Sequence, residues 1–188
     1  FTDSTDWTQT LETYQRVDSP VNGLAENRDD RAASRRTLTN FILMSVLFSA
    51  NHGCVVACLS LATARLGSIG AWQSEILYLT YTGSAIFGAT YFVKKLGARN
   101  ALVTGMSFYC VYVACFWLAV TWQAVEGPAA LIGAAIGGVG AGFLWTAQGV
   151  YFSRAAEEHA IQLGQPVTDS TAYLAGIFAF IYLAAEVG

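Results

Sequence analysis

Charged side chains are scarce over most of this chain. No Asp, Glu, Lys or Arg occurs from Thr37 to Ala64, and residues 100–153 contain only Glu126. Charged residues make up 12% of the sequence, against about 25% in typical soluble domains. A helix that is apolar on all sides needs lipid or a very large core around it. The sequence therefore predicts an all-α polytopic membrane protein.

Other absences argue against whole classes of function. The chain has only ten Lys and Arg, without a basic face, which argues against binding to nucleic acid. No nucleophile–base pair, phosphate-binding loop or metal cluster is visible, so we expect no enzymatic activity. With one of two histidines in an apolar stretch, a bis-His haem is not expected, although a single pigment on His52 stays open. The cysteines lack the spacing of a zinc site; they are Cys54, Cys58, Cys110 and Cys115.

Short polar segments separate five apolar stretches, each long enough to cross a bilayer. Residues 1–36 are polar and of mixed charge, and we interpret them as a solvated tail. The last apolar stretch ends at Gly188 without a polar or basic flank, which suggests that the chain is part of a longer protein. The predicted spans of the membrane domain (37–188) are about 38–64, 72–93, 100–122, 129–152 and 171–188.

A short basic turn at residues 94–99 separates the second and third spans. With five spans, this turn lies on the same side as the N-terminal tail and a polar loop predicted at 153–170. These three segments hold nine of the ten Lys and Arg, and only Arg65 lies on the other side. Because positive loops stay on the cytoplasmic side, the N-terminus is predicted to be cytoplasmic, or on the equivalent side of an organelle.

The fourth span carries small residues at four-residue spacing on two adjacent faces. Such stripes let helices approach closely where lipid provides no hydrophobic driving force between them. They predict close packing of this span against another helix, and a functional hinge at these glycines stays open. The residues are Gly133, Gly137 and Ala141 on one face, and Ala134, Gly138 and Gly142 on the other.

Four polar residues within the spans are candidates for a functional site: Asn51, His52, Gln148 and Glu186. Polar groups in a bilayer are costly and need partners. His52 is the one ionisable group deep in the first four spans, so it can couple protons to transport, or it can stay neutral and form one hydrogen bond between helices. The sequence leaves both roles open.

Two segments of the chain have a distinctive sequence. The first is Ser84-Ala85 followed by Tyr91-Phe92-Val93-Lys94-Lys95-Leu96-Gly97-Ala98-Arg99. The second runs Gly140-Ala141-Gly142-Phe143-Leu144-Trp145-Thr146-Ala147-Gln148-Gly149-Val150-Tyr151. In order and spacing, the two segments resemble the UNC-93-like proteins. This resemblance implies the major facilitator fold, in which two six-helix halves enclose a cavity, and it makes this chain the tail plus most of the N-terminal half. It also implies that Lys94, Lys95, Gly97 and Arg99 belong to a cytoplasmic gate loop, although Lys94 stands where the facilitator motif has Asp.

Two functions fit these observations. The first is a facilitator-like protein that moves a small solute or regulates an ion flux, with the four polar residues facing a cavity. The second is a non-transporting accessory subunit that docks into a larger membrane complex through the small-residue faces of the fourth span. The direction of the polar side chains discriminates between them, because a shared cavity favours transport and bonds to neighbouring helices favour the accessory role.

Overall fold

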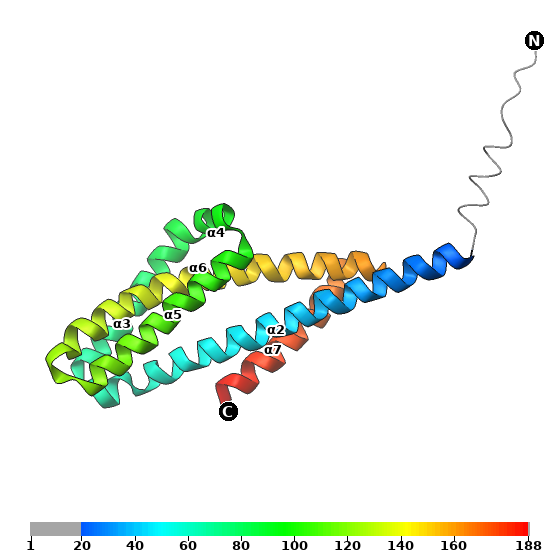
Figure 1. The fold of residues 1–188 in the computed structure, drawn as a ribbon. Helices are drawn as coiled ribbons and strands as arrows, with labels where there is room; N and C mark the ends of the chain where they lie inside the picture. The colour runs from blue at the N-terminus through cyan, green and yellow to red at the C-terminus, as the bar shows by residue number, and fades with distance from the viewer. Residues whose placement is uncertain (1–19, 188) are drawn as a thin grey trace, which may run out of the picture.

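The structure is a computed structural model that describes residues 20–187, and within this range all regular structure is helical (Figure 1). Residues 1–19 of the predicted tail lie outside the described residues. The elements are α2 (Pro20–Leu66), α3 (Ser68–Ser84), the π-helical turn η1 (Ala85–Ala89), α4 (Thr90–Leu96), α5 (Ala98–Thr121), the short 3₁₀ turn η2 (Gln123–Val125), α6 (Glu126–Leu163) and α7 (Val167–Val187).

Five helical stretches of the described residues are long and apolar enough to cross a membrane. This confirms the expected all-helical architecture with five apolar helices. The second stretch is continuous through α3, η1 and α4. The stretches are Arg31–Leu66, Ser68–Leu96, Ala98–Thr121, Gln123–Leu163 and Val167–Glu186.

The helices extend well beyond the apolar runs. The prediction of a polar loop at 153–170 was wrong, because α6 continues to Leu163 and α7 begins at Val167. A polar stretch does not end a helix, since it can present a solvated face. The helix ends where Gly164 takes a left-handed conformation with φ 61° and ψ 34°, which glycine adopts at little cost.

The polar segment before the first span is also helical where it is described. Residues 20–36 belong to α2. Arg31, Ala32, Arg35 and Arg36 are exposed, and the assignment of the segment to a solvated tail stays a prediction. The basic turn is shorter than predicted as well. Gly97 alone separates α4 from α5, with φ 79° and ψ 154°, a backbone conformation that residues with a side chain rarely adopt.

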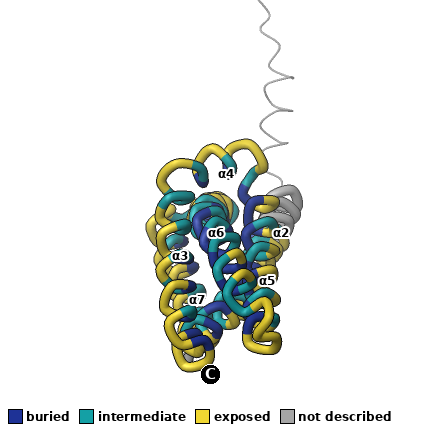
Figure 2. The backbone as a smooth tube through the Cα atoms, turned by 90° about the vertical axis from the view of Figure 1, so that its left-hand side faces the viewer, coloured by how far each residue is buried: buried dark blue, intermediate teal, exposed yellow. Residues whose placement is uncertain are grey.

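Helix α6 lies at the centre of the bundle and contacts α2, α3, α5 and α7. Seen along the bundle in Figure 2, the other helices surround it. Its predicted packing residues face two different neighbours. A Cβ at Gly137 would lie 2.9 Å from the Cβ of Tyr112 on α5, whereas a Cβ at Gly138 would meet the hydroxyl of Thr80 on α3.

The remaining small residues of α6 follow the same division. Gly133 faces Cys115 on α5, Gly142 faces Ser84 at the end of α3, and Ala141 is buried. Both stripes are therefore covered by helices of the same chain. The idea that these faces dock a partner subunit was wrong, because intrachain helices already occupy them.

The described bundle buries several polar side chains beside its apolar core and leaves many large apolar residues exposed. Gln73, Ser45 and Ser49 are fully buried or nearly so, whereas Phe87 on η1 and Phe180 on α7 are 88% and 77% exposed. In lipid, burial of apolar groups gives no driving force, and close packing and hydrogen bonds hold helices together. This distribution is the one expected for helices whose outer surface meets lipid.

Candidate functional site

The candidate site is a His–Glu pair that joins α2 to α7. His52 Nε2 lies 3.8 Å from Glu186 Oε1, and the two side chains are 14% and 29% exposed. The neighbouring Asn51 donates a hydrogen bond from Nδ2 to Cys110 Sγ at 3.4 Å. Cys110 lies near the middle of the 24-residue helix α5. The pair therefore lies at the mid-level of the bundle.

Aromatic rings from four helices surround His52. Its imidazole stacks on Phe48 one turn earlier in α2, with centroids 6.1 Å apart, and meets the edge of Trp145 on α6 at 5.4 Å. Tyr109 on α5 and Tyr182 on α7 lie at 5.9 Å and 5.5 Å. These rings exclude solvent from most of the imidazole and fix its orientation, so that Nε2 points to α7.

A glycine lets α7 come close enough for the pair to form. A Cβ at Gly53 would lie 3.2 Å from the carbonyl oxygen of Ala185, which is tighter than an ordinary contact. The same two helices border a groove of about 390 Å³ beside Glu186, lined also by Cys54 and Ser60. Glu186 thus has one side toward His52 and another toward this groove.

Two of the four predicted polar residues, His52 and Glu186, contact each other, whereas Asn51 bonds to Cys110 at the same level. Gln148 is half-buried on α6, one turn beyond Trp145, and it extends the same helix face away from the pair. Within the described residues, His52 Nδ1 and Asn51 Oδ1 are buried without a hydrogen-bond partner. Such groups are costly in a nonpolar environment. Unpaired buried oxygens also occur at Ser49, Gln73 and Gln162, so this feature is not confined to the level of the pair.

The pair can hold one proton in either of two arrangements. With the proton on His52, the imidazolium and the carboxylate attract each other, and with it on Glu186, both groups are neutral. Both arrangements have no net charge, so their interconversion does not place a charge in the membrane. Loss or gain of a proton from outside does change the net charge.

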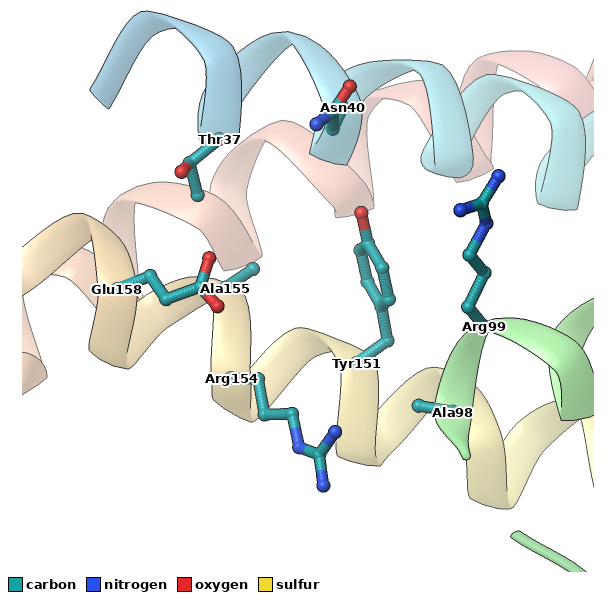
Figure 3. Close-up of a pocket in the computed structure, with 8 residues that line it drawn as sticks. All are labelled: Thr37, Asn40, Ala98, Arg99, Tyr151, Arg154, Ala155 and Glu158. Carbon is teal, nitrogen blue, oxygen red and sulfur yellow. The ribbon is translucent and has the colours of Figure 1, made fainter. Parts of the chain in front are cut away.

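The predicted gate residues lie in different surroundings, and their role in a gate stays a prediction. Lys94 and Lys95 are exposed in the last turn of α4, where positive charge favours the helix dipole. Gly97 forms the turn. Arg99 lies in the first turn of α5 and lines a separate polar cavity between α2, α5 and α6 (Figure 3).

Two buried polar contacts were missed in the sequence. Gln73 on α3 donates a hydrogen bond to the hydroxyl of Tyr112 on α5 at 2.7 Å, and Gln73 is fully buried. Between α6 and α7, His159 Nδ1 lies 3.0 Å from Ser170 Oγ. Gln73 stands beside Trp72, at the predicted start of a span, and His159 stands in a segment interpreted as a loop. Small residues recur at spacings of three and four residues through 153–163, and this helical pattern would have placed His159 on a buried helix face.

Within residues 31–186, no three His, Cys, Asp or Glu side chains are grouped where they could hold a metal ion. The four cysteines are free thiols.

One comparison with known proteins assigns the chain to a family. Residues 69–186 match the sequence model of the family described as "Ion channel regulatory protein UNC-93". The chain belongs to the UNC-93 family. The region matched to UNC-93 contains α6, Arg99, Gln148 and Glu186, whereas His52 precedes it. The His52–Glu186 pair therefore ties the first span to the part that carries the UNC-93 signature. Neither a curated protein nor a solved structure matches the chain.

Proposed function

We propose that this UNC-93 family member is a regulatory membrane subunit that changes ion flux through a partner channel and does not itself form the pore. The family match carries the proposal, because the family is described as regulating ion channels. The direction of the polar side chains supports it. Asn51 bonds to α5 and His52 pairs with α7, so both are used between helices of the bundle.

The packing of α6 limits where a partner channel can bind. Both small-residue faces of α6 are covered from within the chain, so the partner contacts the outer apolar surface of the peripheral helices. That surface is rich in large side chains, among them Leu79 at 74% exposure and Phe87 at 88%. In this proposal, lipid covers the part of the surface that the channel leaves open.

Two measurements together test the regulatory role. Whole-cell currents are recorded in the native cells with and without depletion of the protein, and ion flux is measured in liposomes that contain only the purified protein. We expect depletion to change the current amplitude or its voltage dependence, and re-expression to restore it. The purified protein alone is expected to give no flux above empty liposomes. A robust flux from the purified protein would contradict the proposal.

A second function, proton-coupled movement of a small solute, has one observation in its favour. His52 and Glu186 form a titratable pair on two helices at the mid-level of the bundle, beside a groove. The facilitator fold that underlies this alternative remains a prediction. Its signature would be acidification or alkalinisation of liposomes on addition of a solute, abolished by His52→Gln and retained in the lipid-facing variant Phe180→Leu.

We further propose that the end of the bundle with Lys94, Lys95 and Arg99 faces the cytoplasm. The charge bias of the sequence supports this orientation. Nine of the ten Lys and Arg lie at this end of the spans or in the tail, and Arg65 is the one at the opposite end. Single cysteines placed at exposed Lys95 and at Gln123 in η2 test it in intact cells. We expect a membrane-impermeant thiol reagent to label position 123 and to spare position 95, and the reverse pattern would invert the topology.

A further inference from the structure

A polar cavity of about 220 Å³ lies where α2, α6 and the start of α5 meet. In Figure 3, Thr37, Asn40, Arg99, Tyr151 and Glu158 lie around the space between these three helices, whereas Arg154 extends to the opposite side of α6. Tyr151 points from α6 toward α2, with its hydroxyl near Asn40 and Arg99. The lining consists of Thr37, Asn40, Ala98, Arg99, Tyr151, Arg154, Ala155 and Glu158. The pair His52–Glu186 is not part of it.

The cavity carries more positive than negative charge. Arg99 and Arg154 come from different helices, and Glu158 is the one carboxylate of the lining. Both arginine side chains extend away from Glu158 in Figure 3. Within residues 31–186, no carboxylate lies within 4.0 Å of either guanidinium. The two guanidinium groups are therefore available to an external anion.

The position of the cavity agrees with the level of lipid headgroups. Arg99 lies in the first turn of α5, directly after the Gly97 turn, whereas Trp117 and Trp122 mark the far end of the same helix. Tryptophan favours the membrane interface, and cationic pockets between spans at the opposite interface bind anionic headgroups. The first backbone N–H groups of α5 also favour negative charge here.

From these observations we infer that the cavity binds a phosphate group at the membrane surface, carried by an anionic lipid headgroup. The phosphate oxygens accept hydrogen bonds from the guanidinium group of Arg99, and from that of Arg154 once its side chain turns toward the cavity. The hydroxyl groups of Thr37 and Tyr151 and the amide of Asn40 supply further donors around the phosphate. Glu158 opposes the anion from the α6 side and so limits how much negative charge the cavity accepts. This inference does not depend on the regulatory function proposed above.

Binding is tested on the full chain in detergent by native mass spectrometry and thermal stability. The probes are phosphatidic acid, phosphatidylglycerol and phosphatidylcholine added at equal concentration, and inorganic phosphate alone. We expect retained lipid adducts and thermal stabilisation with the two anionic lipids and not with phosphatidylcholine. Stabilisation by inorganic phosphate to the same extent would support the phosphate site and show that the acyl chains contribute nothing.

Three variants separate this cavity from general surface charge. Arg99→Gln combined with Arg154→Gln should weaken anionic-lipid binding by about a hundredfold, or roughly tenfold for each charge-assisted contact. Lys94→Gln combined with Lys95→Gln removes the same charge near the same end of the bundle, outside the cavity, and should leave binding unchanged. Glu158→Gln should strengthen binding, a change that a purely structural role would not produce.

Equal loss in the arginine and lysine double variants would overturn the inference, because general charge would then explain the binding. A lack of preference for anionic lipid over phosphatidylcholine in the wild type would overturn it as well. If the arginine variant does not fold, Glu158→Gln and the lysine variant still decide the outcome.

Discussion

The close contact between α6 and α3 can be tested by adding one methyl group. In Gly138→Ala, the new Cβ would meet the hydroxyl of Thr80 and the carbonyl oxygen of Leu77, and would lie 2.9 Å from the backbone nitrogen of Tyr81. The hydroxyl can rotate away, but the two backbone atoms cannot. The helices must therefore separate, and this opens the packing on both sides of the contact.

The expected cost follows from two opposing effects. Overpacking a close contact costs about 1–3 kcal/mol, and rigid backbone neighbours place Gly138→Ala at the upper end. Alanine is favoured over glycine within a helix by about 1 kcal/mol. The variant should therefore lose about 2 kcal/mol of unfolding free energy. Gly149→Ala in the same helix meets nothing within 4 Å, so it should gain up to about 1 kcal/mol.

The measurement is a reversible unfolding titration with sodium dodecyl sulfate in mixed micelles, followed by tryptophan fluorescence. The informative quantity is the difference between the two variants, about 3 kcal/mol by this reasoning. Adding Thr80→Ala to Gly138→Ala should recover only part of the loss, because the Leu77 carbonyl remains. Equal stability of Gly138→Ala and Gly149→Ala would refute the assignment of this face to helix packing.

Three further variants test other contacts in the same unfolding assay. Tyr112→Phe leaves the buried amide of its glutamine partner on α3 without a hydrogen bond and should cost about 1–3 kcal/mol. Gly97→Ala should lower the free energy of unfolding by about 1–3 kcal/mol, because the conformation with φ 79° and ψ 154° is accessible almost only to glycine. Gly164→Ala should lower it by about 1 kcal/mol, because Gly164 lies in the left-handed helical region. A double-mutant cycle of His52→Gln and Glu186→Gln should give a coupling free energy of about 1 kcal/mol.

Each of these expectations has a result that opposes it. Tyr112→Phe with wild-type stability would mean that the glutamine finds another partner. Equal losses of stability in Gly97→Ala and Gly164→Ala would mean that the backbone conformation of the glycine does not determine the loss. A coupling of about zero would mean that the histidine and the glutamate are neighbours without an interaction, and the candidate site would lose its basis.

The five helices and the two faces of α6 could be predicted because their signals are local. A long uncharged run forms a membrane-spanning helix in lipid, and glycines four residues apart lie on one face of any helix. Glycine spacing did not reveal which helix covers each face. The sequence alone does not distinguish a face that meets α3 from a face that meets a partner, because both need small residues.

The extent of α6 was missed for a different reason. Residues 153–163 are polar, and polarity alone does not distinguish a loop from a solvated helix, whereas Gly164 and Pro166 are the residues at which the helix ends. The contact between His52 and Glu186 could not be predicted for another reason. Each residue was visible as an isolated polar group, but their contact depends on the close approach of α2 and α7 at Gly53, and tertiary geometry of that kind leaves no periodic pattern.

The central place of α6 also has a consequence for biosynthesis. Helices α2, α3 and α5 precede α6 in the chain, yet α3 and α5 both rest against it. During translation, these earlier spans enter the membrane before their common neighbour exists, with Thr80 and Ser84 still turned toward lipid. The bundle can close only after the ribosome has released Leu163, so the half-made protein depends on the insertion machinery to keep its first spans apart until the central helix arrives.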